Sequence, residues 1–438
     1  MNETNIKELL NKASQLEKDD NLEEAITFLH FALELNTNCN LAYQQLGDIS
    51  FKQKDLEKAL NFYNQSLNID ANVALVQYNV AEINRIQNCA EEAIKHYTKA
   101  IQLEPFNNSP FIQLMFMQVE SHQLDEVACC YQELSKTNPN NPWVDVKLGN
   151  VLTKQGKIEQ AIASYQNATY KMTQKFNPEY VAKHWQQAKP AEPSFIIIGP
   201  MKTATSALYE YINQHPLVLS CIEKEVHFFN DQNKFSQGKD WYTAHFPLIP
   251  ERENFITGEA SPGYIVNNIQ ERVFKMFPKI KPIALIRNPI DRAFSHYQHN
   301  VKHGFERRTF QEAIFSELEV LKSVEDPAEI AKKWHWGAHP GYVLIGCYFY
   351  FLKQWLDIFP EQQFLILNNQ DLLVNPEATM KEVFNFLELP DYTLVEYPKY
   401  NSGSYEPIDD DIKQKLSDVF RPHNSKLEEF VNKKLNWD

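Results

Sequence analysis

Apolar and small residues recur every 34 positions through the first part of the chain, up to about residue 175. Four columns of positions keep this spacing: Ala25, Ala59, Ala93, Val127 and Ala161; Leu29, Tyr63, Tyr97, Tyr131 and Tyr165; Ala32, Ser66, Ala100, Leu134 and Ala168; Ala13, Gly47, Ala81, Met115 and Gly149. The pattern therefore predicts about five repeats of one structural unit over residues 6–175.

This array resembles the tetratricopeptide repeat, a helix pair of the same length. Each pair leaves an apolar face that only the next pair covers, so stacked pairs form a superhelix with a concave groove. The resemblance implies that the groove binds a peptide or a partner protein. The alternative is an array that only caps or dimerises the domain behind it.

A junction at residues 176–193, where three prolines break the helical pattern, separates the array from the rest of the chain. Over residues 194–438, short apolar runs alternate with helical stretches. The apolar runs are residues 195–198, 282–286 and 363–367. This alternation predicts an α/β domain with a parallel sheet, whose ligands bind at the carboxyl ends of the strands.

The first apolar run leads into a helical pattern through a loop with one glycine and one lysine, Gly199 and Lys202. In a strand–loop–helix unit, backbone N–H groups converge on an anion and the helix dipole favours negative charge there. The loop lacks the Gly-Lys-Ser/Thr triplet of nucleotide triphosphatases. It therefore predicts a phosphate-bearing ligand other than ATP or GTP.

A second phosphate-binding element follows the run at residues 282–286, where Arg287 stands at the tip of the predicted strand. Asn288 suits a helix N-cap and Pro289 the first helical position, which places Ser295 about two turns along the helix. A guanidinium and a hydroxyl so placed can clamp one phosphate, although Arg287 alone can also be a simple ion-pair partner. Two such elements suit a nucleotide with phosphates at both ends of its ribose.

Several further motifs make Ser194–Asp438 resemble the sulfotransferases that use 3′-phosphoadenosine 5′-phosphosulfate, and in particular their heparan sulfate branch. The motifs are K-E-V-H-F-F at 224–229, D-W-Y at 240–242, F-P at 246–247, G-E-A-S-P-G-Y at 258–264 and F-R-P-H-N at 420–424. The resemblance implies a P-loop-like α/β sulfotransferase fold behind an all-α tetratricopeptide superhelix. It also implies transfer of a sulfuryl group, without a metal, to a hydroxyl or amine of a glycan or related metabolite.

The resemblance assigns roles to individual residues. Lys202 is expected to assist departure of the leaving phosphate, and Glu225 to accept the proton of the acceptor. Arg287 and Ser295 are expected to hold the 3′-phosphate of the nucleotide. The other expected nucleotide contacts are Gly199, Lys202, Thr203, Ala204, Thr205, Ser206 and, in a loop that matches more weakly, Gly403.

Each catalytic role has an alternative. Lys202 can be a plain phosphate counter-ion, and Glu225 a surface glutamate paired with Lys224. His227 is a rival base, because histidine as a residue type suits proton transfer near neutral pH, while the resemblance favours a structural or substrate-contact role for it. The residues expected to bury Glu225, and thereby to raise its pKa, are Phe228, Phe229 and Trp241.

The acceptor is less closely defined. The basic stretch at residues 302–308, with Arg307 as a candidate contact, fits a site for a sugar acid or a solvated helix end. Trp336 belongs to an aromatic cluster that suits either a sugar or a core. Ala260 stands where animal heparan-modifying enzymes commonly carry lysine, which weakens the case for heparan itself. A peptide tyrosine, small phenol or lipid headgroup remains an alternative acceptor, and a nucleotide kinase or a non-catalytic scaffold an alternative function.

Composition narrows the class of protein. A net charge of −14 argues against a general binder of nucleic acid or acidic membranes. No apolar stretch approaches about 18 residues, and the polar start Met1–Leu10 is unlike a signal peptide, so a cytoplasmic protein without a membrane span is expected. The six cysteines are scattered without a C-x-x-C pair, which predicts free core thiols and no metal or redox site.

Overall fold

The structure, a computed structural model, describes residues 2–117, 121–251, 253–322, 329, 340–398 and 407–437. The chain forms two compact units, Met1–Ser164 and Tyr165–Asp438. The division falls inside helix α10 (Ile158–Phe176), earlier than the junction at residues 176–193. The domain limits expected from the sequence therefore stay a prediction.

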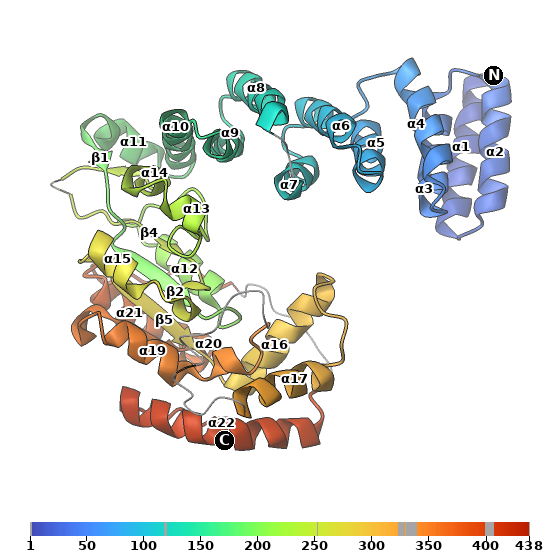
Figure 1. The fold of residues 1–438 in the computed structure, drawn as a ribbon. Helices are drawn as coiled ribbons and strands as arrows, with labels where there is room; N and C mark the ends of the chain where they lie inside the picture. Colours follow the sequence, from blue (N-terminus) through green and yellow to red (C-terminus); the bar gives the residue numbers. More distant parts are fainter. Residues whose placement is uncertain are drawn as a thin grey trace. The chain divides into compact units, whose positions relative to one another are not determined.

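The first unit is an array of paired helices joined by short turns, coloured from blue to green in Figure 1. Contacts are extensive between α1 and α2, between α3 and α4, and between α5 and α6. The helices are α1 (Asn2–Lys18), α2 (Leu22–Leu35), α3 (Asn40–Lys52), α4 (Leu56–Ile69), α5 (Ala74–Ile86), α6 (Ala90–Leu103), α7 (Asn108–Phe116), α8 (Ser121–Thr137), α9 (Pro142–Lys154) and the start of α10. The array confirms the helical repeats that the 34-residue spacing predicts.

The 34-residue columns are the buried contacts between these helices. Every column position whose side chain the structure describes is buried. Gly47 shows why small residues are needed, because a Cβ there would lie 2.4 Å from Cε1 of Tyr63. The Tyr63 hydroxyl donates to Asp48 Oδ1 at 2.6 Å, and one period later Tyr97 donates to Glu82. The period therefore carries a polar pair as well as apolar contacts.

The second unit is built on a parallel sheet of four strands in the order β4-β2-β5-β6. The strands are β2 (Phe195–Gly199), β4 (Gly258–Ala260), β5 (Lys281–Ile286) and β6 (Leu365–Asn368). A separate antiparallel pair joins β1 (Lys189–Pro190) to β3 (Leu248–Ile249). The sheet confirms the α/β fold. Strands β2, β5 and β6 coincide with or overlap the three predicted apolar runs, whereas β4 matches none of them.

Both faces of the central strand β2 are covered, which explains why its sequence is apolar without alternation. Phe195 and Ile197 lie in the core that the sheet shares with α12 (Thr205–Asn213) and α21 (Pro376–Phe386). Ile196 and Ile198 point to the other face and are equally buried, each 0% exposed. The carboxyl ends of β2 and β5 therefore meet at one edge of a rigid core.

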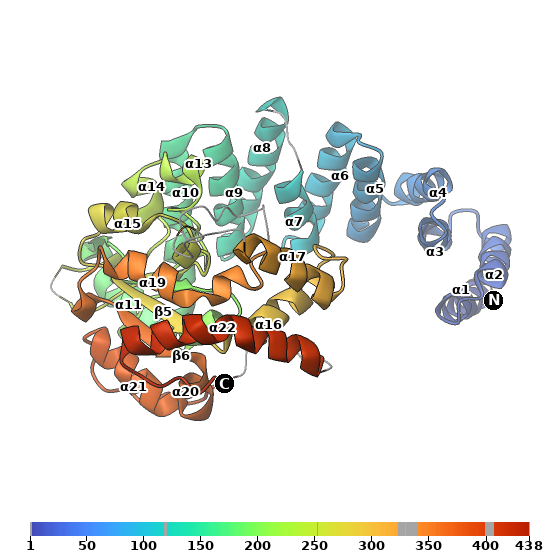
Figure 2. The same ribbon diagram turned by 60° about the horizontal axis from the view of Figure 1, so that its bottom comes forward.

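Further helices surround the sheet. They are α11 (Pro178–His184), α13 (Gln232–Phe235), α14 (Lys239–Thr243), α15 (Gln270–Met276), α16 (Pro289–Lys302), α17 (Phe310–Lys322), α19 (Tyr348–Leu356), α20 (Asn369–Val374) and α22 (Asp410–Val431). Figure 2 shows α22 lying beside α16 and α19, both of which it contacts. This packing holds α16, which starts directly after β5, against the body of the unit.

Disulfides, membrane-spanning helices and clusters of metal ligands are all absent from the described part of the chain. All six cysteines are free, but Cys89 and Cys129 are exposed, so the predicted core position was wrong for these two. Within the described residues, no helix has both the length and the apolar character that a bilayer span requires. Nor do any three His, Cys, Asp or Glu side chains of these ranges gather as ligands of a metal would.

Candidate functional site

The loop between β2 and α12 is shaped by three left-handed residues. Gly199 has φ +107°, and a Cβ there would lie 1.9 Å from the carbonyl oxygen of Pro262. Only glycine therefore lets β2 end this close to the chain after β4. Lys202 and Ala204 follow with φ +68° and +73°, which turns the loop sharply into α12.

The loop is held from its inner side. Thr203 Oγ1 donates to the carbonyl of Pro200 at 2.7 Å, and Asn369 Nδ2 donates to the carbonyl of Thr203 at 2.9 Å. Among the described residues, no hydrogen bond uses the backbone N–H groups of the loop and the first turn of α12. These groups belong to Thr203, Ala204, Thr205 and Ser206. A fixed loop with unpaired donors at a helix start is suited to an anion.

The second predicted element lies beside this loop. Arg287 follows β5 directly, and its Nη1 donates to the carbonyl of Lys202 at 3.1 Å. Asn288 caps α16, as predicted, by accepting from the N–H of Ile290 at 2.9 Å. The helix therefore starts at the same edge of the sheet as the loop, and half-buried Ser295 lies two turns along it. Sequence reasoning placed these two elements together, and the structure does so.

Positive charge accumulates at this edge. Burial lowers the pKa of Lys202, and the charges of Arg287 and Lys302 lower it further. Fully buried Arg292 of α16 adds a guanidinium whose Nε and Nη1 have no partner among the described residues. Neighbouring cations repel one another, and a bound anion relieves that repulsion. This edge of the sheet therefore fits a ligand with several negative charges.

The segment with Glu225 docks on the same loop. Lys224 Nζ donates to Ser206 Oγ at 2.5 Å and lies 3.4 Å from Glu225 Oε1. His227 Nε2 lies 3.5 Å from Glu225 Oε2 on the other side. Glu225 therefore does pair with Lys224, as the alternative interpretation of this residue expected. The pair lies beside the β2–α12 loop, however, and not on a surface away from it.

The expectation of a raised pKa for Glu225 is wrong. Phe228, Phe229 and Trp241 are buried in the core, while the Glu225 side chain is 43% exposed. Burial still acts to raise the pKa of Glu225, but the hydrogen bond with His227 and the charge of Lys224 outweigh it and lower that pKa. Glu225 is therefore a carboxylate over a wide pH range.

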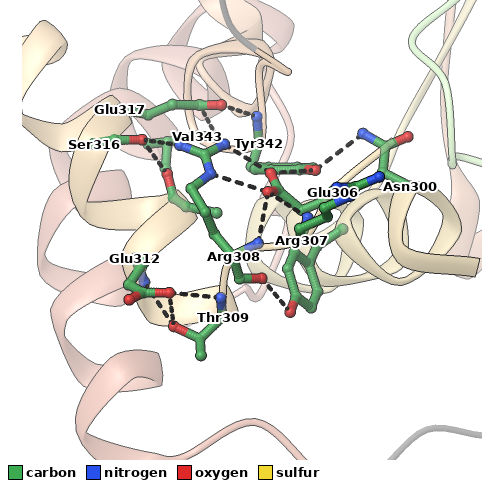
Figure 3. A network of polar contacts seen from close by, with 12 residues as sticks. Asn300, Glu306, Arg307, Arg308, Thr309, Glu312, Ser316, Glu317, Tyr342 and Val343 are labelled. Carbon is green, nitrogen blue, oxygen red and sulfur yellow. Dashed lines mark hydrogen bonds and ion pairs between the residues drawn. The ribbon is translucent and has the colours of Figure 1, made fainter. Parts of the chain in front are cut away.

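The basic stretch after α16 divides into two roles (Figure 3). Arg308 donates from Nε to Glu306 Oε1 at 2.9 Å and from Nη2 to Oε2 at 2.7 Å. The hydrogen bond from Arg308 lowers the pKa of buried Glu306 to about 2. Arg307 gives this network only its backbone N–H, at 3.0 Å from Glu306 Oε1, and its own side chain is exposed. Arg308 is thus a structural residue, and Arg307 stays available to a ligand.

Two predicted residues, Trp336 and Gly403, lie outside the described residues. Sequence reasoning missed the contact of Lys224 with Ser206 and that of Asn369 with the loop. The signal for Asn369 is its place directly after β6, because polar residues at the carboxyl end of a parallel strand face the ligand edge. For the contact of Lys224 with Ser206, the sequence offers no comparable signal.

Comparison with known proteins agrees with this geometry. The model of the sulfotransferase domain matches residues 192–416, and that of the tetratricopeptide repeat matches residues 41–73. Three relatives illustrate the similarity. The membrane-associated sulfotransferase kil1 of Dictyostelium discoideum is 26% identical over 314 residues, which cover 56% of this chain and 66% of kil1.

The other two relatives act on heparan sulfate, as their names state. Bifunctional heparan sulfate N-deacetylase/N-sulfotransferase 3 of Homo sapiens is 31% identical over 281 residues, covering 57% of this chain and 31% of that protein. Heparan sulfate glucosamine 3-O-sulfotransferase 5 of Mus musculus is 31% identical over 268 residues, covering 56% of this chain and 74% of that protein. The chain spans less than two thirds of the length of the first two relatives.

Proposed function

Because the chain belongs to the sulfotransferase family, we propose that it transfers a sulfuryl group from 3′-phosphoadenosine 5′-phosphosulfate to a hydroxyl or amine. The observation that carries this proposal is the junction of the β2–α12 loop with Arg287 and Glu225 at one edge of the sheet. This junction offers two places for anions and one carboxylate beside them. Sulfuryl transfer from a doubly phosphorylated nucleotide needs the same set of groups.

The residues at this edge fit the nucleotide. The free N–H groups from Thr203 to Ser206, with Lys202, would hold the 5′-phosphosulfate. Arg287 and Ser295 would hold the 3′-phosphate, and Gly403 would add a contact from its loop. When bound, the nucleotide supplies a sulfuryl group on a good leaving phosphate.

Lys202 is proposed to stabilise the negative charge that develops on the leaving phosphate. One such cation, aimed at the bridging oxygen, is worth roughly 3 kcal/mol. Burial and the charges of Arg287 and Lys302 lower the pKa of Lys202, which makes its proton easier to donate. Electrostatics therefore support Lys202 as a donor to the leaving oxygen rather than a passive counter-ion.

Glu225 is proposed to accept the proton of the attacking acceptor. Glu225 is ionised at neutral pH and can therefore accept that proton, and its lowered pKa makes it a weaker base than an unshifted glutamate. The 3.5 Å contact with His227 Nε2 orients the carboxylate, which supports a positioning or substrate-contact role for His227. The contact of neighbouring Lys224 with Ser206 links the base to the phosphate loop.

The acceptor is proposed to be an anionic glycan or related metabolite. Lys302 and Arg307 are exposed cations at and beyond the end of α16, and Lys302 acts electrostatically on Lys202. Such cations suit a carboxylate or sulfate near the attacking hydroxyl. A phenol or a peptide tyrosine is the alternative acceptor, and would depend less on these charges.

The repeat array is proposed to bind a peptide or protein partner in its groove, which would bring the partner to the enzyme. A cytoplasmic location is proposed from the sequence alone. A scaffold without catalysis is the second candidate function, and the experiment that follows separates the two.

The experiment measures transfer of labelled sulfate from the nucleotide into a panel of glycan, phenol and peptide acceptors by the full chain. Lys202→Ala and Glu225→Gln are expected to lower the rate by at least about 100-fold. Lys353→Ala, at an exposed lysine paired with Asp357 on α19, is the control and is expected to stay active. Full activity in both site variants would refute the assigned roles, and no transfer by the wild type would favour the scaffold.

A further inference from the structure

Glu259 on β4 is a fully buried carboxylate that the proposed chemistry does not use. Its oxygens accept four hydrogen bonds. The donors are Tyr242 Oη at 2.7 Å, Tyr264 Oη at 3.1 Å, Ser261 Oγ at 2.7 Å and Val226 N at 3.2 Å. A buried carboxylate needs such a complete set of donors, because an unpaired charge is costly away from water.

One of these donors links Glu259 to the proposed base. The N–H of Val226 belongs to the peptide bond directly after Glu225, and it donates to Glu259 Oε2. The next N–H, of His227, donates at 3.2 Å to Ser261 Oγ, which itself donates to Oε2 of Glu259. Two successive peptide groups beside Glu225 are thus fixed by one buried carboxylate, directly and through a hydroxyl.

The backbone that these bonds hold is unusual. Glu225 and His227 have φ of +66° and +55°, a left-handed conformation that residues other than glycine rarely adopt. Such conformations persist only where the surroundings determine them. From this backbone, Glu225 reaches Lys224 on one side and His227 on the other, at 3.4 Å and 3.5 Å.

We propose that Glu259 is a positioning residue, which holds residues 225–227 in the conformation that directs the Glu225 carboxylate to the transfer site. This inference rests on the proposed role of Glu225 as the base. Glu259 acts through the N–H of Val226 and through Ser261, not by touching the nucleotide or the acceptor. Its acceptor oxygen matters for this role, and its charge does not.

Three variants of the full chain separate these features. Glu259→Leu has a similar volume but no acceptor, so it frees the N–H of Val226. Ser261→Ala removes the acceptor of the His227 N–H and one of the four donors to Glu259, but leaves the bond between Val226 and Glu259 in place. Glu259→Gln keeps one carbonyl oxygen for Val226 and removes the charge, so it is the conservative variant. Val383→Ala, at a fully buried position of α21, is the control for lost stability alone.

The assay measures kcat and the KM of the nucleotide for sulfate transfer, with calorimetric binding of adenosine 3′,5′-bisphosphate. Glu259→Leu is expected to lower kcat about 100-fold, and Ser261→Ala about tenfold, because a displaced base loses its alignment. The affinity for the bisphosphate is expected to stay within about twofold of the wild type, since the β2–α12 loop is unchanged. Glu259→Gln is expected to keep most of the kcat, and Val383→Ala to lower the Tm only.

Wild-type kcat in both Glu259→Leu and Ser261→Ala would overturn the inference, and so would a loss in Glu259→Gln equal to that of Glu259→Leu. If Glu259→Leu does not fold, Ser261→Ala decides. Glu225→Gln is measured beside them: if it stays active, the proposed base is wrong. If Glu225→Gln is inactive while Ser261→Ala and Glu259→Leu are not, only the positioning role fails.

Discussion

His245 makes the stability of the second unit depend on pH in a way that can be worked out in advance. The imidazole is fully buried and packs against the rings of both Tyr165 and Trp241, with ring centroids 4.1 Å and 4.5 Å away. Its Nδ1 contacts the carbonyl of Trp241 at 3.0 Å, and its Nε2 has no partner among the described residues. Burial lowers the pKa of His245 from 6.5 to about 3.

The folded chain therefore keeps this histidine neutral where the unfolded chain protonates it. Stability is fully present above pH 6.5 and is lost as the pH falls from there toward 3. Each pH unit in this window costs about 1.4 kcal/mol. His245 alone is expected to remove about 2 kcal/mol of unfolding free energy at pH 5, compared with pH 7.5.

The assay is urea unfolding of the full chain at pH 7.5 and pH 5, followed by tryptophan fluorescence, because every tryptophan except Trp143 lies beyond residue 164. His245→Phe keeps the ring contacts but cannot be protonated. Between pH 7.5 and pH 5 its free energy of unfolding should therefore fall by about 2 kcal/mol less than that of the wild type. Phe246→Leu, at a neighbouring buried position, should lower stability equally at both. Equal pH dependence in wild type and His245→Phe would refute the reasoning.

Three further changes test the site and its support. Gly199→Ala should lower the Tm and weaken binding of adenosine 3′,5′-bisphosphate, because its Cβ would lie 1.9 Å from a carbonyl oxygen; unchanged calorimetric binding would contradict this. Arg287→Ala should weaken the same binding by about 2 kcal/mol, or roughly 30-fold, through lost charge-assisted hydrogen bonds, and an unchanged Kd would count against the predicted clamp. Arg308→Ala should cost about 1–2 kcal/mol in thermal unfolding at pH 7, because Glu306 loses its charged partner, which is itself 42% exposed, and keeps the N–H groups of residues 307 and 308 and the Tyr342 hydroxyl. That cost should shrink as the pH falls below 4.5, because the carboxyl of Glu306 is then protonated in the unfolded chain. It should fade further toward pH 2, where the folded wild type also loses this stabilisation. A cost that does not change with pH would contradict this prediction.

Two features could be predicted from the sequence: the buried positions of the repeat array and the meeting of the β2–α12 loop with Arg287. A 34-residue period identifies the buried column positions because each repeat packs on its neighbour in the same way. The β2–α12 loop and Arg287 were expected to meet because the carboxyl ends of neighbouring parallel strands share one edge. The hydrogen bond from Arg287 to the Lys202 carbonyl, at 3.1 Å, lies at this edge.

The direction of the Glu225 pKa was not predictable in the same way. It depends on the left-handed backbone at Glu225 and His227, which turns the carboxylate away from the aromatic core and toward Lys224. No periodicity encodes such a local conformation, since it is imposed by Glu259, more than thirty residues later in the chain. The structural role of Arg308 was equally unpredictable, because the turn after α16 is what brings its side chain to Glu306.

The most direct measurement of the central claim is a calorimetric titration of the full chain with adenosine 3′,5′-bisphosphate and, separately, with adenosine 5′-monophosphate. Two anion sites at one sheet edge predict that the bisphosphate binds about 100-fold more tightly, because Arg287 and Ser295 gain the 3′-phosphate. Equal affinities, or no binding of either nucleotide, would contradict the account.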